Sequence, residues 1–295
     1  MIPYRLWVAL AYTRIPGNAF SFWIRKTLRW SRGTPALPDE PKDDLFAYLD
    51  TEAEGDPSTV TGGERARAEA RERELRERYD LGPLRARSTA ALYRKGLYLL
   101  DILERAAEGL DLPPAGPVRA LDVGAQDWHY VFALERWLTR GGGASRPARL
   151  RGVELDGHGV YPDLRSRRDY ARAYAAQTGN PEVEYEVADF LRVDGDGFDI
   201  FTWFYPFVTR HHLLLWGLPL RHFRPREQIA KAASLLRPGG RLVVLAHTAA
   251  EHAAFRDLAR AQGDLEPVRE GEARSGLVDF HAEVGDRRYS IWRRR

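Results

Sequence analysis

The feature that most constrains the fold is a series of short apolar runs separated by segments with helical spacing. Five such runs occupy residues 119–123, 150–155, 183–187, 198–203 and 241–246. Short apolar runs that alternate with helical patterns are typical of a parallel sheet whose two faces are both covered. The sequence therefore predicts one α/β domain over residues 84–295, built on a mostly parallel sheet with helices on both faces.

The ends of this domain carry their own signals. Residues 276–284 and 287–292 flank the dipeptide Gly285-Asp286, which suits a tight turn, and predict an antiparallel hairpin at the sheet edge. The hairpin brings the expected number of strands to seven. Ser88 is predicted to cap the helix before the first strand. Thr248 is predicted to cap the helix after the fifth, which stops at Gly263.

Residues 1–83 form a predicted helical extension of uneven charge. Residues 1–38 carry six basic and no acidic residues, whereas residues 39–56 carry eight acidic and one basic. Pro16-Gly17-Asn18 predicts a break between two short helices, with Asn18 as the N-cap of the second. Residues 64–79, rich in Glu and Arg, predict a helix that is either solvated all round or packed only along Leu75 and Tyr79.

The basic and aromatic segment at residues 1–32, which holds Trp7, Trp23 and Trp30, has two interpretations. As a lid, its helices would cover a ligand site on the main domain. As an interfacial helix, Phe20, Trp23 and Leu28 would enter lipid headgroups beside arginines that meet anionic lipid. The acidic run directly after it favours packing within the protein, so both interpretations stay open.

Composition narrows the class of protein. The chain has no cysteine, which excludes a disulfide framework, a thiolate metal site and thiol catalysis. The 45 basic residues nearly balance the 42 acidic ones, so no general nucleic-acid footprint is expected. No run approaches the roughly eighteen apolar residues of a membrane span. A cytoplasmic protein, with peripheral membrane contact through residues 1–32 as a further option, is the expectation.

Polar and aromatic side chains follow the ends of successive predicted strands. They stand in the segments Asp122-Val123-Gly124-Ala125-Gln126-Asp127-Trp128, Glu154-Leu155-Asp156, Ala188-Asp189-Phe190 and Trp203-Phe204-Tyr205-Pro206-Phe207. In an open parallel sheet, ligands bind beyond the carboxyl ends of the strands, where the strand order switches. We therefore expect these segments to surround one ligand site.

Five segments, in chain order, carry a family resemblance: ALDVGA (120–125), GVELD (152–156), VADF (187–190), FDIFTWFYP (198–206) and LLRPGGRLVV (235–244). In this series, residues 117–295 resemble the class I, Rossmann-like S-adenosylmethionine-dependent methyltransferases. The last segment is the most specific. The resemblance implies a Rossmann-like sheet of seven strands, S-adenosyl-L-methionine as cofactor, and methyl transfer as the reaction.

The resemblance also implies roles for single residues. Asp122 and Gly124 belong to the first motif, where Gly124 lets the backbone approach the cofactor closely. Glu154 is placed to accept hydrogen bonds from the two ribose hydroxyls. Asp189 is placed to accept from the adenine amino group, with Phe190 against the purine ring. The alternative for Glu154 and Asp189 is that each only caps a loop.

The first motif departs from the family pattern, which runs acid-x-Gly-x-Gly-x-Gly. Here Gln126 and Trp128 stand where the second and third glycines are expected. Either the loop takes another path, with Gln126 or Asp127 bonding the methionine end of the cofactor, or the cofactor site is altered. Trp128 and Tyr130 are expected to start a helix that faces the core. The alternative places Trp128 beside the sulfonium, where an aromatic face suits a cation.

The segment after the fourth strand predicts the acceptor pocket. The aromatic cluster with Trp203, Tyr205 and Pro206 favours a partly apolar acceptor, a small molecule or a lipid-like compound. His211 or His212 is the candidate base for the acceptor proton, because histidine titrates near neutrality. The blander alternative is a pair of structural histidines. No metal-ligand spacing is evident, so no metal is expected.

Two other functions compete with methyl transfer. The broken glycine motif supports a methyltransferase-fold protein without catalysis that serves as a binding or scaffold module. A nicotinamide-dependent oxidoreductase is disfavoured, because the pyrophosphate-binding glycines and a dehydrogenase catalytic pair are both lacking in the sequence.

Overall fold

A seven-stranded sheet organises the structure, a computed structural model that describes residues 10–43, 45–46, 61–110, 116–143, 145–195, 197–277 and 286–295. Its strands are β1 (Val118–Val123), β2 (Ala148–Glu154), β3 (Val183–Val187), β4 (Phe198–Phe204), β5 (Leu236–Ala246), β6 (Leu265–Glu272) and β7 (Arg288–Arg294). The order across the sheet is β3-β2-β1-β4-β5-β7-β6, and only β7 runs antiparallel to the other strands. The predicted Rossmann-like fold with an antiparallel C-terminal hairpin is confirmed.

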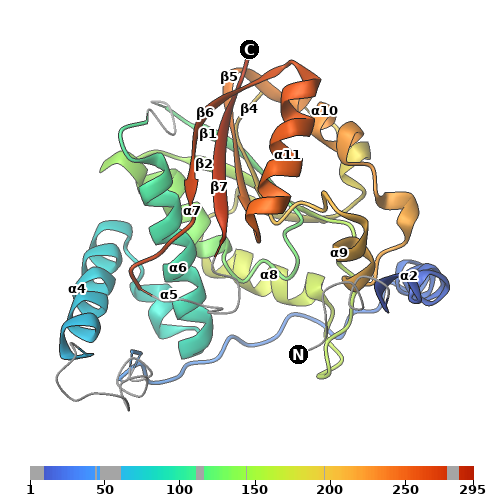
Figure 1. The fold of residues 1–295 in the computed structure, drawn as a ribbon. Coiled ribbons are helices and arrows are strands. Elements are labelled where there is room, and N and C mark those ends of the chain that lie inside the picture. The colour runs from blue at the N-terminus through green and yellow to red at the C-terminus, as the bar shows by residue number, and fades with distance from the viewer. Residues whose placement is uncertain are drawn as a thin grey trace.

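Helices cover both faces of the sheet (Figure 1). They are α5 (Gly82–Ala86), α6 (Ala90–Ala107), α7 (Val131–Arg140), α8 (Arg167–Gln177), α9 (Arg210–Leu215), α10 (Pro225–Leu235) and α11 (Ala249–Gln262), with short 3₁₀ helices at Gly141–Gly143, Phe190–Arg192 and Leu220–His222. Successive strand residues point to opposite faces. Ala120 and Ile200 therefore pack in the core beneath α6, α7 and α8, while Leu121 and Phe201 pack beneath α10 and α11.

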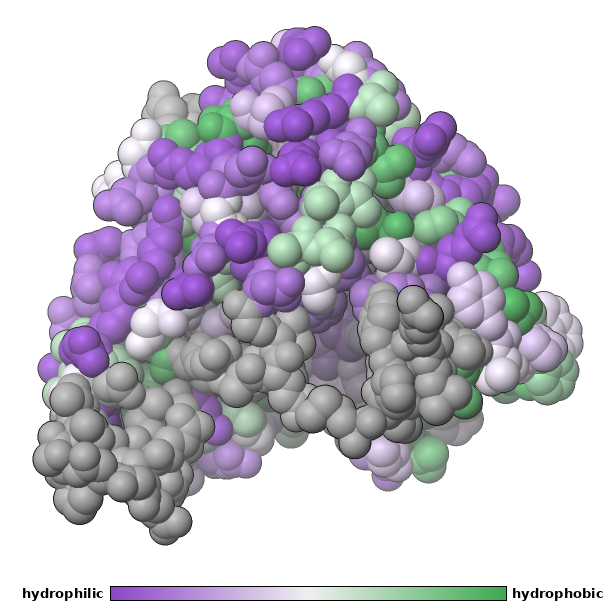
Figure 2. All heavy atoms as spheres, viewed as in Figure 1, coloured by the Kyte–Doolittle hydropathy of each residue, from purple (hydrophilic) through white to green (hydrophobic). Residues whose placement is uncertain are grey.

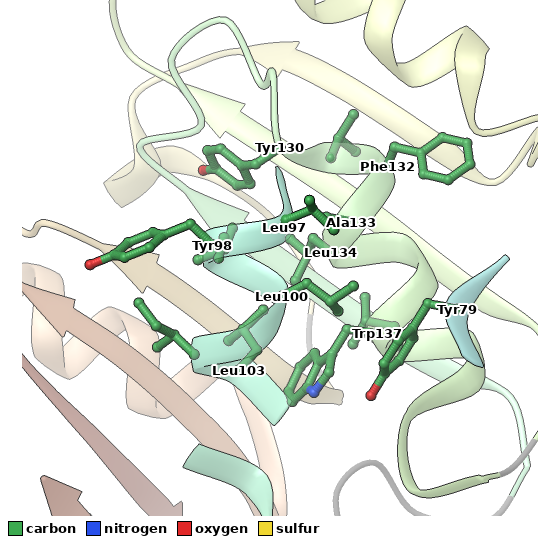
Figure 3. Packing of buried hydrophobic residues seen from close by; sticks show 14 of the residues in the cluster. Tyr79, Leu97, Tyr98, Leu100, Leu103, Tyr130, Phe132, Ala133, Leu134 and Trp137 are labelled. Carbon is green, nitrogen blue, oxygen red and sulfur yellow. The ribbon is translucent and has the colours of Figure 1, made fainter. Parts of the chain in front are cut away.

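The two helical layers bury their apolar stripes and leave polar residues outside. On the face drawn in Figure 2, hydrophilic residues dominate the surface over most of the described part of the molecule. Inside, Leu97 and Leu100 of α6 pack against Leu134 of α7, with Trp137 and Tyr79 close by (Figure 3). Because α6 and α7 pack tightly, the loop before α7 has a fixed support.

Two local predictions for the main domain need correction. The first hairpin strand is Leu265–Glu272, not residues 276–284, and residues 278–285 lie outside the described part. An edge strand with one exposed face and a proline gives only a weak apolar pattern. The cap of α6 is Thr89, which accepts from Leu92 N at 3.1 Å, whereas Ser88 bonds Leu84 O. Thr248 and Gly263 do cap α11 as predicted.

The N-terminal extension contributes α2 (Ile15–Leu28) and α4 (Thr61–Tyr79). Helix α2 begins before Pro16, which is tolerated in the first turn, so Asn18 is not its N-cap. The Asn18 side chain instead donates to Leu214 O at 2.7 Å. Residues 1–9, with Trp7, lie outside the described part. Figure 1 shows α2 and α4 far apart, and residues 29–43 run from α2 along one side of the domain.

Helix α4 takes the packed alternative. Leu75 and Tyr79 are fully buried, and Ala68 joins them in the main core. Arg71 pairs with the buried carboxylate of Asp101 on α6 at 2.8 Å. Within the described residues, no helix is long and apolar enough to cross a membrane.

Candidate functional site

A cavity of about 330 Å³ lies beyond the carboxyl ends of β1, β2 and β4. Its volume is within the range of small-molecule sites, and its position is the one expected for a ligand of an open parallel sheet. Eight predicted site residues line it: Gly124, Gln126, Glu154, Asp189, Phe190, Trp203, Tyr205 and His212. Asp122, Pro206 and His211 lie outside this lining, so the structure brings together most, not all, of the predicted site.

The loop after β1 keeps the backbone that glycines would favour. Gly124, Gln126 and Trp128 have φ values of 76°, 56° and 57°, all in the left-handed region. A non-glycine residue in this region costs free energy, because its Cβ crowds the backbone. The loop thus has left-handed residues at the three positions of the glycine motif, although only the first is glycine.

Trp128 is fully buried and points away from the cavity. Its indole packs over Gly152 of β2, where an added Cβ would lie 2.5 Å from Trp128 Cζ2. Its Nε1 donates to Asp122 Oδ2 at 2.8 Å. The core-facing orientation expected from the sequence is therefore observed, and the position beside a sulfonium is not. Helix α7 starts later than expected, at Val131, with Tyr130 as its N-cap.

Asp122 lies beneath the loop. Besides Trp128 Nε1, its carboxylate accepts from Tyr130 Oη at 2.8 Å and from Thr202 Oγ1 at 2.6 Å. Complete burial raises the pKa of Asp122 to about 6, and the three hydrogen bonds only partly oppose this shift. Asp122 therefore supports the loop from below.

Glu154, at the end of β2, connects two loops at the cavity wall. Oε2 accepts from Gln126 N at 2.9 Å, and Oε1 accepts from Asp156 N at 2.8 Å. Burial raises the pKa of Glu154, although the positive charge of Arg167 lowers it. Each carboxylate oxygen can accept more than one hydrogen bond. Glu154 thus caps two loops, which was the alternative considered from the sequence, and it also lines the cavity.

Asp189 has a similar double position. Its Oδ1 accepts from Leu191 N at 3.1 Å and so caps the 3₁₀ helix that contains Phe190. Its Oδ2 lies 3.8 Å from Nδ1 of His222, which also lines the cavity. Burial lowers the pKa of His222. Two carboxylates on neighbouring strands therefore border one cavity.

The other end of the cavity is aromatic and contains a His–Glu pair. His212 Nδ1 lies 2.5 Å from Oε1 of Glu251, a buried residue of α11. Burial opposes ionisation of Glu251, but the hydrogen bond and charge of His212 hold its pKa below the usual value. Glu251 was missed in the sequence, where Thr248-x-x-Glu251 resembles a simple capping box. His211 is buried outside the lining, and burial lowers its pKa.

Tyr205 forms the strained corner of this end. Its φ is 58°, and its ring stacks on His247 with centroids 3.8 Å apart and planes 10° from parallel. Burial raises the pKa of its phenol to about 12, so the phenol is neutral at physiological pH. Pro206, the next residue, is buried outside the lining. Among the described residues, no three potential metal ligands converge.

Helix α2 borders the same region. Phe22 is buried with Leu213 and Leu218, which line the cavity. Arg25 pairs with Asp156, two residues beyond Glu154, at 2.8 Å. Helix α2 is thus fixed beside the site by apolar and ionic contacts and by the hydrogen bond from Asn18 to Leu214 O.

No protein-family model matches the chain, and no curated protein is significantly similar to it. Among solved structures, it is similar to TrmN from Thermus thermophilus, with 20% identity and a TM-score of 0.44 over 65% of this chain and 48% of that one. The chain thus spans about half the length of TrmN. It is also similar to a TehB-like SAM-dependent methyltransferase from Corynebacterium glutamicum (16%, TM-score 0.42, 78% and 100% of the two chains) and to the N-methyltransferase NodS from Bradyrhizobium japonicum (14%, 0.42, 65% and 92%). At this level of similarity, the three structures establish no activity for the chain.

Proposed function

We propose that the chain transfers a methyl group from S-adenosylmethionine to a small-molecule or lipid-like acceptor. The observation that carries this proposal is the convergence of Glu154, Asp189 and the left-handed loop at residues 124–128 around one cavity. Two carboxylates disfavour a phosphate-bearing ligand but suit a nucleoside that donates hydrogen bonds and carries a positive sulfur. In this proposal Glu154 accepts from the ribose hydroxyls, and Asp189 accepts from the adenine amino group.

In this proposal, the cavity walls, His212 and Glu251 have separate roles in methyl transfer. When bound, S-adenosylmethionine supplies a methyl group on a positively charged sulfur, which is a good leaving group. The cavity walls align the acceptor, and alignment contributes most of the rate in such a displacement. With Nδ1–H of His212 donated to Glu251, Nε2 keeps its lone pair and can take the acceptor proton. His212 is then the base, and Glu251 fixes its tautomer.

The alternative is a methyltransferase-fold module without catalysis. Its main support in the sequence is the loss of two glycines from the first motif. That support weakens, because Gln126 keeps a left-handed backbone and Trp128 buries its side chain away from the cavity. Of the two replaced glycines, Trp128 leaves the cavity open, whereas Gln126 lines it.

Calorimetric titration with adenosylhomocysteine tests the proposal. The wild-type protein should bind it, and Glu154→Gln should weaken binding about tenfold to a hundredfold, because hydrogen bonds to a charged acceptor are lost. Glu182→Gln is the matched control, since Glu182 is exposed at the opposite end of β3 and pairs only with Arg149 in the described residues. Absence of wild-type binding, or equal affinity of Glu154→Gln and wild type, would contradict the proposal.

A further inference from the structure

The large apolar side chains that the described part of the chain exposes gather at one pole. Six belong to helix α2 or its flanks: Leu10, Tyr12, Phe20, Trp23, Leu28 and Trp30. Val160 and Leu164 belong to the turn after β2, and Trp216 follows α9. Phe20 and Leu28 are 63% and 70% exposed. We call these nine residues the α2 pole.

Direct contacts join the three segments of the α2 pole. Trp30 Nε1 donates to Leu164 O at 2.7 Å, which ties the end of α2 to the turn. Arg25 Nη2 donates to Gly217 O at 3.3 Å, next to Trp216. Phe20 and Trp23 stack with centroids 6.2 Å apart. In Figure 2, apolar and weakly polar residues mark the lower right edge, where α2 lies in Figure 1.

The turn after β2 presents its apolar side chains on a fixed backbone. Leu164 has a φ of 65°, an unfavourable conformation for a branched apolar residue. The turn is closed by Tyr161 N to Arg165 O and Leu164 N to Tyr161 O, both at 2.9 Å. It therefore holds Leu164 in the exposed position at an energetic cost.

Charge decides what this surface fits. Residues 10–38 contain five basic and no acidic residues, and Lys26 and Arg29 are exposed on the same helix as Trp23. The opposite side of α2 packs against the main domain through Phe22 and Asn18. A helix with exposed aromatic residues and basic neighbours is the pattern that binds an anionic bilayer surface. Exposed apolar side chains that gather in one region of the surface, as these nine do, mark an interaction site.

The α2 pole also adjoins the entrance of the candidate active site. Trp216 belongs to the pole and lines the cavity, and Leu213 and Leu218, which also line the cavity, pack on Phe22 of α2. A bilayer that met α2 would thus lie next to the cavity.

We propose that the α2 pole docks on an anionic lipid bilayer and turns the cavity toward it. Trp23, Phe20 and Leu164 enter the headgroup region, and Lys26 and Arg29 meet lipid phosphates. One consequence rests on the proposed function: the methyl acceptor is a compound carried in the bilayer. The lid and membrane interpretations of the N-terminus are then compatible, because opposite sides of α2 serve them.

Vesicle co-sedimentation of the full chain tests the docking. The protein should pellet with phosphatidylcholine vesicles that contain phosphatidylglycerol, less with phosphatidylcholine alone, and less as salt is added. Phe20→Ala with Trp23→Ala, and separately Lys26→Glu with Arg29→Glu, should each lower the partition coefficient at least about tenfold. Arg260→Glu with Arg274→Glu is the charge-matched control, because both side chains are exposed and lie outside the α2 pole, and it should bind like wild type.

Three outcomes would overturn the docking: no wild-type binding, equal binding by all variants, or a dimer in light scattering that Trp23→Ala dissociates while vesicles are ignored. The last result would assign the surface to a second copy of the chain. Adenosylhomocysteine titration of the same variants separates the two proposals. Vesicle binding without nucleoside binding keeps the docking but removes the proposed function and the bilayer-borne acceptor. Nucleoside binding without vesicle binding keeps the proposed function but removes the docking and, with it, the bilayer-borne acceptor.

Discussion

Replacing Gly152 by alanine should destabilise the protein through Trp128. The new Cβ would lie 2.5, 2.6 and 2.8 Å from Cζ2, Cε2 and Cη2 of the indole, whereas carbon atoms in contact are about 3.5–4.0 Å apart. The indole must therefore move by about 1 Å, relative to that contact distance. It has no free space, since it is fully buried and bonded to Asp122.

The magnitude follows from two effects. Overpacking a core costs about 1–3 kcal/mol, and loss of the hydrogen bond to the Asp122 carboxylate costs about 1.5–3 kcal/mol. The better strand propensity of alanine offsets less than about 1 kcal/mol. Gly152→Ala should therefore lower the free energy of unfolding by about 2–6 kcal/mol. At about 2 °C per kcal/mol for a chain of this size, Tm falls by about 4–12 °C.

Urea denaturation of the wild type and four variants checks the reasoning. Gly82→Ala is the control, because a Cβ there meets nothing within 4 Å, and its stability should change by less than about 1 kcal/mol. Trp128→Leu removes the ring that Cβ would strike, so adding Gly152→Ala to it should cost far less than in the wild type. If Gly152→Ala melts like wild type, or costs the same in both backgrounds, the proposed packing is wrong.

Four further outcomes concern the loop and the His–Glu pair. As the pH rises from about 4 to about 6, the wild type should lose more stability than Asp122→Asn. The reason is that the folded pKa of Asp122, about 6, lies above its unfolded value, so the stability contributed by the protonated carboxyl is lost over this range. Denaturation midpoints measured across this range test the expectation. Trp128→Gly should cost about 3–5 kcal/mol or prevent folding, and a variant that melts like wild type yet binds adenosylhomocysteine more tightly would show instead that Trp128 blocks the site. Gln126→Gly should keep stability within about 1 kcal/mol and change adenosylhomocysteine affinity, measured by calorimetry. In ¹⁵N-histidine spectra, His212 should carry its proton on Nδ1 and shift toward the other tautomer in Glu251→Ala; an unchanged tautomer would remove the positioning role of Glu251.

Strands were easier to predict from the sequence the more completely the fold buries them. Strand β4 is buried along its whole length and left a largely apolar run in the sequence. Strand β3, at the opposite edge of the sheet from β6, alternates apolar residues with glutamate and was recognised by that alternation. Strand β6 is paired on one side only and contains Pro267, and its position was therefore misassigned. The start of α2 was also misplaced, because proline marks a break in a helix interior but is tolerated in a first turn.

The lining of the cavity was predictable where it depends on position after a strand, as for Glu154 and Asp189. It was not predictable where backbone conformation decides. Glutamine and tryptophan carry no signal for a left-handed φ, so the path of the loop could not be inferred from Gln126 or Trp128. The pairing of His212 with Glu251 joins segments that are distant in sequence, and only the packing of α11 brings them together.

The left-handed Gln126 and Trp128 have a thermodynamic consequence for ligand binding. Glycine leaves a loop many alternative conformations, and a ligand that orders such a loop pays for their loss in entropy. Here the anchored indole of Trp128 and the bond from Gln126 N to Glu154 order the loop within the folded protein. Binding should then carry a smaller entropic penalty than in the Gln126→Gly variant, and van't Hoff analysis of affinities at several temperatures would show the difference.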